Sequence, residues 1–247
     1  MGITQLHRDD VIESLPGPVL MKKGSEIHNI PSPKSKSSKI CFRLSQIING
    51  VKKNTPLCRE ADFIIRKCSG IRELDDVYRL AHDCYLERKY CDPQPDGRLI
   101  QYPHLDNIPE TTVLVAYSRP GLIGTVSITV DSKRGFNVEE DFPDEVESAR
   151  AEGITLASSW RLASRNDNRH EKKVVMKLLE HNFKYIFNVL KADALMSTFN
   201  PRHERIYQRL FKFRTIARSN TSVGKLKNAP AVLMRLDRDA IPARWLR

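Results

Sequence analysis

The segment ITLASSWRLAS, residues 154–164, reads as a strand whose side chains and backbone could bind an anion. Arg161 can hold a carboxylate through two parallel hydrogen bonds, and Trp160 beside it can form the wall of a pocket. The backbone N–H groups of Leu162, Ala163 and Ser164 can stabilise an oxyanion if the strand fixes their positions. We therefore predict a binding site along this segment, with plain core packing as the alternative for Trp160.

The segment NPRHERIY, residues 200–207, contributes further candidate site residues. Asn200 followed by Pro201 is typical of the start of a helix. His203, in the first turn of that helix, is predicted to brace the site, since imidazole is a common acid or base. A purely structural role is the alternative for both Asn200 and His203.

An earlier helix, predicted over Leu74 to Tyr90, carries a second group of polar candidates. Its apolar residues recur at the spacing of one helical face. Arg79 and Arg88 could bind a carboxylate or a phosphate, although a solvated helix face explains them equally well. His82 lies next to the face assigned to the core, and Tyr85 lies on that face. We predict that these four residues contribute to substrate binding.

The elements that must position these residues alternate in a way that indicates an α/β (α+β) fold. A long apolar-periodic helix, 171–190, follows the strand at 154–164, so strand and helix N–H groups converge on one spot. Two strand–helix units and a hairpin predict a mixed, mostly antiparallel sheet flanked by helices. The loop 91–110 is long and rich in proline, and we expect it to be ordered over a pocket. The other predicted strands are 62–68, 111–117, 122–130, 193–199, 214–219 and 231–237, and the other helices are 143–153 and 201–211.

Composition limits the class of protein. The chain has 247 residues, a formal net charge of +11 and 40% hydrophobic residues, which suits one large domain with an acidic partner. No apolar run is long enough for a membrane helix, and no signal region opens the chain, so a cytoplasmic protein is expected. The five cysteines form no C-x-x-C pair, so we predict neither a disulfide framework nor a metal site.

The chain divides into three predicted parts. Residues 1–60 are a basic extension containing Pro, Ser and Lys, largely flexible, in which 40–51 could form a docking helix. Residues 61–240 are the folded domain, and residues 241–247 are a short C-terminal tail. The basic extension could contact nucleic acid or a membrane, but a solvated extension is the simpler interpretation.

Four blocks of the sequence resemble a known family. They are YRLAHDCYLERKYCDPQPDG (78–97), the hairpin PETTVLVAY with LIGTVSITVDS, NPRHERIYQRLFKF (200–213) and KNAPAVLMRLD (227–237). In this order they are similar to the N-acyl amino acid synthases, which have the GNAT-like acyltransferase fold and are related to the acyl-homoserine-lactone synthases. The resemblance extends over about residues 62–237.

The resemblance implies transfer of a long acyl chain from acyl carrier protein to the amine of an amino acid. Acyl carrier protein is acidic, which would match the positive charge. No cofactor would stay bound, since the donor is the acyl-phosphopantetheine arm of the carrier. Tyr207 falls where many GNAT enzymes place a tyrosine near the leaving sulfur. GNAT enzymes that use coenzyme A usually have a glycine-rich turn for its pyrophosphate, and RNDNRH (165–170) has no glycine, which also favours a carrier donor.

One position departs from the family pattern. The central strand usually reads A-E-V-S-x-L-A, and its glutamate falls on Ser158, which cannot act as a carboxylate base. Another acid, Glu87, Asp83 or Asp131, could replace it. Three alternatives follow: a synthase of the acyl-homoserine-lactone type with a different amine acceptor, a catalytically impaired relative that binds acyl chains or the carrier, or a relative that binds nucleic acid, a partner we do not expect.

Overall fold

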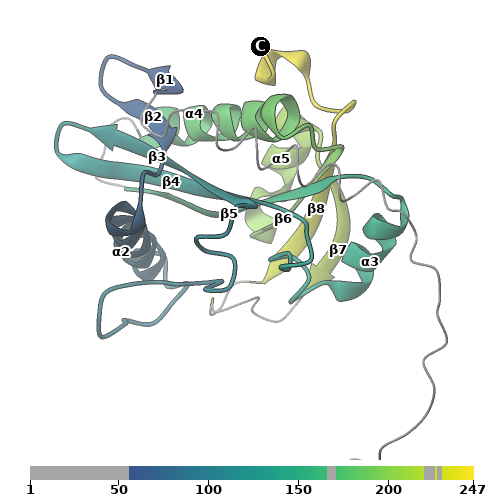
Figure 1. The fold of residues 1–247 in the computed structure, drawn as a ribbon, viewed down its shortest axis with the longest axis horizontal. Coiled ribbons are helices and arrows are strands. Elements are labelled where there is room, and N and C mark those ends of the chain that lie inside the picture. Colours follow the sequence, from purple (N-terminus) through teal and green to yellow (C-terminus); the bar gives the residue numbers. More distant parts are fainter. Residues whose placement is uncertain (1–55, 166–170, 220–225, 227–229) are drawn as a thin grey trace, which may run out of the picture. The chain divides into compact units, whose positions relative to one another are not determined.

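The computed structural model describes residues 56–165, 171–219, 226 and 230–247. Eight strands form one sheet with the order β1-β2-β3-β4-β5-β6-β8-β7 (Figure 1). The strands are β1 (Cys58–Arg59), β2 (Ile64–Lys67), β3 (Thr111–Ser118), β4 (Gly121–Val130), β5 (Leu156–Ser164), β6 (Ala194–Phe199), β7 (Arg214–Ser219) and β8 (Ala231–Asp237). Every neighbouring pair is antiparallel except β5 and β6, which are parallel. The predicted fold class is confirmed.

Helices cover both faces of this sheet (Figure 1). On one face lie α2 and α3, and on the other lie α4 and α5. Alternation along the strands explains the division, because Leu114 and Ala116 of β3 face α4 while Val115 faces α2. The helices are α2 (Ile71–Glu87), α3 (Pro143–Ala151), α4 (Glu171–Phe183), continued by the π-helix η1 (Lys184–Val189), and α5 (Glu204–Phe211), preceded by the 3₁₀ turn η2 (Pro201–His203).

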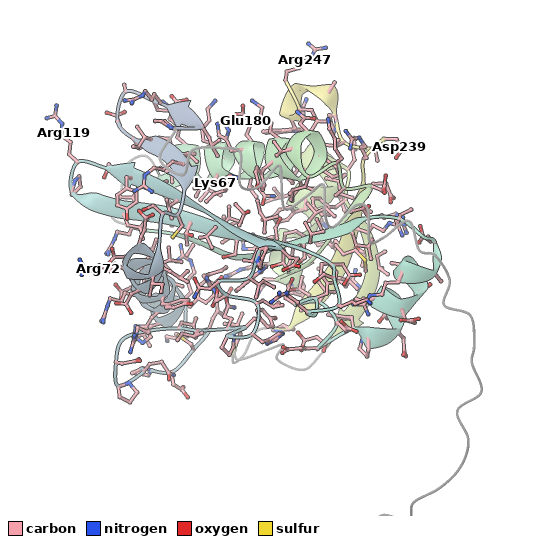
Figure 2. The ribbon with its side chains drawn as sticks, viewed as in Figure 1. Lys67, Arg72, Arg119, Glu180, Asp239 and Arg247 are labelled. Carbon is pink, nitrogen blue, oxygen red and sulfur yellow. The ribbon has the colours of Figure 1, made fainter. Side chains whose placement is uncertain are left out.

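Charged side chains lie on the solvent-exposed surface of the sheet and helices. Arg72, Arg119 and Asp239 point away from the sheet (Figure 2) and are exposed. Lys67 is an exception, since it is buried and donates a hydrogen bond of 2.8 Å from Nζ to the Tyr185 hydroxyl. In the part of the chain that the structure describes, no helix is both long enough and apolar enough to cross a bilayer.

Several predicted boundaries differ from the structure. Strand β1 lies inside the predicted extension and pairs with β2, so the ordered sheet begins before residue 61. Within residues 241–247, Trp245 of the 3₁₀ turn η3 (Ala243–Trp245) contacts the Phe211 ring at a centroid distance of 4.8 Å. Helix α2 begins at Ile71 rather than Leu74, and α4 ends in a π-helix. The possible helix 40–51 lies outside the described residues.

Candidate active site

The sheet opens between β5 and β6. The two strands pair only through Leu156 with Ala194 and Ala157 with Leu195, and beyond these pairs they separate. A cavity of about 440 Å³ lies at this gap. Gln101 and Tyr102 line it from the loop 91–110, and Val175 and Met176 line it from α4, which lies on the other face of the sheet. The cavity therefore connects the two faces, and the predicted cover of the loop 91–110 over a pocket is present.

The cavity has an apolar part and a polar part. The apolar part is surrounded by side chains from strands β4 and β6, helices α4 and α5 and the segment after α5: Val126, Val175, Met176, Leu179, Phe183, Leu195, Phe199, Phe211 and Phe213. The polar part is lined by groups from the segment after α2, the start of α4 and the segment after β6: Arg88, Tyr90, Glu171, Asn200, Arg202 and His203. Such a combination suits a ligand with a long apolar chain and a polar head.

A β-bulge interrupts β5 beside the cavity. Thr125 of β4 pairs with Ala163 and Ser127 pairs with Trp160, so Arg161 and Leu162 together oppose the single residue Val126. Arg161 takes a left-handed backbone conformation with φ of +52°. Such a conformation is costly for a residue with a Cβ, by about 1–3 kcal/mol, so surrounding contacts must hold it.

The bulge decides which backbone groups face the gap. Before it, the Ser159 N–H points toward β6 and donates to the Ser197 hydroxyl at 3.0 Å. After it, the Arg165 N–H donates to the Ile123 carbonyl of β4 at 3.1 Å. Alternation along the strand then places the N–H groups of Leu162 and Ser164 on the edge that β6 leaves unpaired. The Ala163 N–H faces β4 instead, so of the three predicted oxyanion donors two have a suitable direction.

Arg161 is among the residues that line the cavity, but its guanidinium is paired inside the protein. Its side chain is 0% exposed, and Nη2 donates to both carboxylate oxygens of Asp106 at 2.8 Å. The guanidinium also lies over the rings of Trp160 and Tyr78, at 4.2 and 5.0 Å from their centroids. This geometry argues against the predicted carboxylate clamp, because the charge is already matched inside the protein. Asp106 was not among the predicted site residues.

Trp160 and Ser158 lie on the α2 face of β5. Trp160 lines the cavity, meets the Tyr102 ring edge to face at 5.1 Å and donates from Nε1 to the Thr129 hydroxyl at 2.9 Å. Ser158 is fully buried, its hydroxyl has no partner among the described residues, and it is not part of the cavity lining. A serine at this position therefore supplies no group to the cavity.

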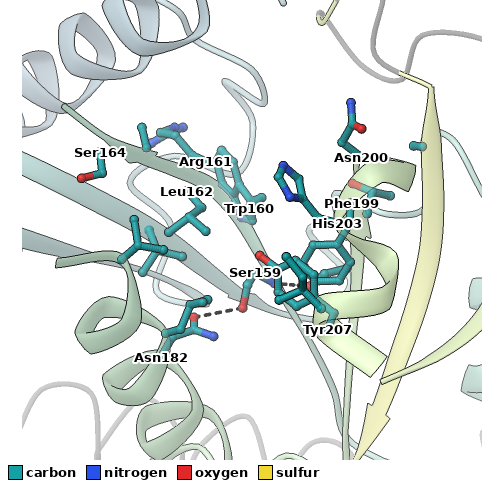
Figure 3. A pocket seen from close by; sticks show the side chains of 18 of the residues that line it. Ser159, Trp160, Arg161, Leu162, Ser164, Asn182, Phe199, Asn200, His203 and Tyr207 are labelled. Atoms are coloured by element: carbon teal, nitrogen blue, oxygen red, sulfur yellow. Dashed lines mark hydrogen bonds between the residues drawn. The ribbon is translucent and has the colours of Figure 1, made fainter. Parts of the chain in front are cut away.

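The neighbouring Ser159 points to the opposite face and was missed from the sequence. Its hydroxyl donates to Asn182 Oδ1 on α4 at 2.9 Å, and Figure 3 shows this bond inside the cavity, with Arg161 directed away from it. Both residues line the cavity. Asn182 sits among the apolar residues of α4, and a buried polar residue on a core-facing helix was the available signal.

The segment after β6 forms a hydrogen-bonded network at the polar part of the cavity. Asn200 accepts from the Arg202 N–H at 3.1 Å and thereby caps η2, as predicted, and its Nδ2 donates to the Tyr90 hydroxyl at 3.2 Å. Arg202 also donates to the Tyr90 hydroxyl and, from Nε, to His203 Nε2 at 3.2 Å. Tyr90 and Arg202 were not predicted, because a link across 112 residues leaves no local pattern.

His203 and Tyr207 both line the cavity (Figure 3). Partial burial, with the nearby guanidinium groups of Arg202 and Arg88, lowers the pKa of His203 below its usual value of 6.5. The imidazole is therefore neutral at neutral pH. Burial raises the pKa of Tyr207 to about 12, so its hydroxyl stays protonated. The Tyr207 ring stacks on Phe199 at a centroid distance of 3.9 Å, which fixes its direction.

The α2 candidates divide into two pairs. Tyr85 and Arg88 line the cavity: the Tyr85 hydroxyl donates to the Leu162 carbonyl at 3.4 Å, and Arg88 Nη2 bonds Glu171 at 3.1 Å. Burial raises the pKa of Tyr85. Arg79 and His82 lie outside the lining. Arg79 pairs with Asp75 on the surface, and buried His82 accepts from the Gln94 N–H at 3.0 Å, which anchors the loop 91–110.

Acidic groups are scarce in this cavity. Among the described residues that line it, Glu171 is the only carboxylate, and it is paired with Arg88. The acids suggested as substitutes for the missing glutamate lie elsewhere: Asp131 is paired with Arg150, and Asp83 and Glu87 are not among the lining residues. Across the described residues, no group of three His, Cys, Asp or Glu side chains is arranged as a metal site.

Comparisons with known proteins agree with this geometry. Residues 76–237 match the family model described as "N-acyl amino acid synthase FeeM". The solved structure of FeeM, an N-acyl amino acid synthase from uncultured soil microbes, is similar with a TM-score of 0.61 and 24% identity, covering 75% of this chain and 93% of FeeM. A comparison with curated protein sequences gives no match.

Two acyl-homoserine-lactone synthases share the fold. LasI is similar with a TM-score of 0.58 and 14% identity over 76% of this chain and 95% of LasI. BjaI, a CoA-dependent synthase, has a TM-score of 0.50 and 15% identity over 70% of this chain and 78% of BjaI. With the matched family model covering more than half of the chain, this protein belongs to the N-acyl amino acid synthase family and is an acyltransferase.

Proposed function

We propose that the protein transfers a long acyl chain from acyl carrier protein to the amine of an amino acid. The observation that carries the proposal is the continuous cavity through the β5–β6 gap, with its apolar part between α4 and α5. An acyl chain fits the apolar part. The amine acceptor would approach from the face of Gln101, Tyr102 and Trp160, so donor and acceptor would meet beside the bulge.

The choice of carrier protein over coenzyme A rests on charge and on the sequence before α4. The chain carries +11, and Arg202, Arg205 and Arg209 are exposed on η2 and α5, which also supply lining residues. An acidic carrier would be attracted to this surface. The segment RNDNRH, which lacks the glycines of a pyrophosphate cradle, lies mostly outside the described residues.

The proposed location is a reducing cytoplasm. Cys84 and Cys91 are present as free thiols.

The chemistry uses the groups along β5 and α5. The neutral amine attacks the thioester carbonyl, its nitrogen forms the new C–N bond, and the electrons of the carbonyl move to oxygen. The N–H groups of Leu162 and Ser164 would stabilise that oxyanion. Collapse breaks the C–S bond, and Tyr207 would donate its proton to the departing thiolate. The tyrosinate would then regain a proton, through water, from the group that accepted the amine proton. The donation from Tyr207 helps only moderately, because a thiol with a pKa of roughly 8.5 is already an acceptable leaving group.

The proton released by the amine needs an acceptor. An α-amine has a pKa of about 7.7–8.0 and is largely protonated at neutral pH. Two lining groups could accept the proton, neutral His203 and the carboxylate of Glu171, directly or through water. His203 would first have to release the hydrogen bond that its Nε2 accepts from Arg202.

The full-length protein incubated with acyl carrier protein loaded with a long chain, and with a mixture of amino acids, is expected to yield N-acyl amino acids by mass spectrometry. Parallel reactions contain acyl-coenzyme A as donor or an aminolactone precursor as acceptor. Equal rates with both donors would contradict the carrier assignment, and product from the aminolactone precursor alone would move the protein to the related synthases.

Absence of any product from every donor would refute the proposed function. In that case the variant Ser158→Glu distinguishes two causes. Activity that appears in the variant would identify a catalytically impaired relative, whereas an inactive variant that binds DNA in a strongly salt-dependent way would favour a nucleic-acid-binding relative.

A further inference from the structure

The loop 91–110 supplies a buried carboxylate to the strand that carries the proposed oxyanion donors. Asp106 and Arg161 are 55 residues apart, and their side chains are 3% and 0% exposed. The Arg161 Nη2 group is the only nitrogen of that guanidinium with a hydrogen-bond partner among the described residues, since Nε and Nη1 have none. Asp106 is therefore the main polar contact that holds the Arg161 side chain.

This contact lies at the strained residue of the bulge. Arg161 has φ of +52°, a conformation that side chains with a Cβ avoid. Glycine usually occupies such a bulge position because it tolerates positive φ. A long arginine there requires an external hold, and the ion pair together with the Trp160 and Tyr78 rings provides it.

We propose that Asp106 is a positioning residue for acyl transfer, which holds the β5 bulge through Arg161 and so fixes the N–H groups of Leu162 and Ser164 toward the β5–β6 gap. The inference rests on the proposed oxyanion role of those two groups. Without the ion pair, the bulge would be free to shift its register by one residue, and that shift would turn the donors toward β4.

The same ion pair links the bulge to the part of the cavity from which the amine acceptor would approach. Leu105 and Tyr102 of the loop pack with Trp160 in one buried cluster, and Gln101 and Tyr102 line the cavity. The Tyr85 hydroxyl meets the Leu162 carbonyl immediately after the bulge. A single buried ion pair thus ties the loop 91–110 to β5 at the place where the reacting groups would meet.

The variant Asp106→Asn tests the proposal, with Asp131→Asn as its matched control. Asp131 is also a largely buried aspartate in an ion pair with an arginine, Arg150, and it is not among the lining residues. We expect Asp106→Asn to lower kcat by up to about 100-fold with little change in the KM of the acyl donor, because small displacements of reacting groups have effects of that size. The control should keep the kcat of the wild type.

Hydrogen exchange of the peptide 156–165, measured by mass spectrometry, gives a readout that needs no substrate. Exchange should accelerate in Asp106→Asn and stay unchanged in Asp131→Asn. Unchanged exchange in Asp106→Asn would overturn the proposal, and so would faster exchange with an unchanged kcat. A wild-type protein without activity would refute the proposed function, while the exchange result would still decide whether Asp106 positions the bulge.

A second variant covers the case in which Asp106→Asn does not fold. Replacing both partners, as Asp106→Leu with Arg161→Met, removes two buried charges together, a change that proteins often tolerate. The double variant should fold, lose at least about tenfold in kcat and show faster exchange in the peptide 156–165. A folded double variant with the kcat of the wild type would overturn the proposal.

Discussion

Two clusters of side chains, one around Arg161 and one around Arg202, lie beside the cavity. They differ in solvent exposure and in the charge of the partners that the arginine contacts. Arg161 is sealed between two aromatic rings and bound to Asp106, with no exposed side-chain surface. Arg202 is exposed and contacts neutral partners, Tyr90 and His203. The first cluster holds backbone geometry, and the second lies where a substrate head group and protons would enter. The comparison shows that an arginine beside a cavity need not bind substrate, because burial and existing partners decide its role.

The largest expected effect is a difference in stability between a variant of the Arg161 cluster and a variant of the Arg202 cluster. Arg161→Ala leaves the Asp106 carboxylate buried and unpaired, so the free energy of unfolding should fall by about 3–5 kcal/mol. Arg202→Ala removes an exposed side chain and should cost less than about 1 kcal/mol. Denaturant unfolding of both variants measures the difference. Similar losses in the two variants would contradict the division between a sealed and an open cluster.

Filling the apolar part of the cavity with a larger side chain should change the preference for the length of the acyl chain. Leu179→Trp places a larger side chain in the apolar part, so long acyl chains would lose the burial of several methylene groups, each worth about 0.8 kcal/mol. We expect kcat/KM to fall roughly 30-fold for a long chain, equivalent to about 2 kcal/mol, and to change little for a short chain. Competition between short-chain and long-chain acyl carriers measures this ratio.

The matched control for this variant is Lys173→Trp, which adds the same side chain to the exposed side of α4. It should leave the chain-length preference unchanged. A preference that moves equally in both variants would place the acyl chain somewhere other than the apolar part of the cavity.

Removal of the Tyr207 hydroxyl should have a moderate effect. Tyr207→Phe keeps the ring stack on Phe199 but removes the proton donor, and kcat should fall up to about tenfold, below the usual range for an acid because the leaving thiol is good. Tyr185→Phe is the control, since Tyr185 is buried off the cavity and bonds Lys67. Single-turnover rates measured for both variants test the role, and an unchanged rate in Tyr207→Phe would exclude it.

The smallest effect concerns pH. The pKa of His203 is lowered from 6.5, so the imidazole remains neutral through neutral pH and becomes protonated only in more acidic solution. Activity should begin to decline at about pH 8 in every variant, because the α-amine of the acceptor becomes protonated. If neutral His203 accepts the amine proton, the wild type should show a second, separate acid limb at a pH below 6.5, and His203→Gln should remove only that lower limb. Because water could partly substitute in a cavity open to solvent, we expect only about a threefold loss at pH 7.

The variant Glu171→Gln completes this pH test. A lower acid limb that persists in His203→Gln and disappears in Glu171→Gln would assign the proton to the carboxylate that pairs with Arg88. A lower limb that persists in both variants would leave water as the acceptor, in line with the scarcity of carboxylates along the described lining.

Local patterns in the sequence were enough to predict most of the elements. The strands Arg214–Ser219 and Ala231–Asp237 match their predicted bounds, and the hairpin of β3 and β4 differs by one residue at either side of its turn. Lys212 ends α5 with φ of +72°, a left-handed conformation that glycine usually adopts at a helix end. Alternation, periodicity and turn residues are properties of neighbouring residues, so a single chain reveals them.

The sequence by itself therefore determined the fold class, the family and the segments that surround the site. Only the tertiary structure decided that Arg161 pairs with Asp106, that Ser159 meets Asn182 and that Trp245 covers Phe211. It also decided that β5 and β6 share two residue pairs before they separate, and that β5 bulges at Arg161. These features depend on strand register and on partners distant in sequence, and no local pattern of residue types specifies either.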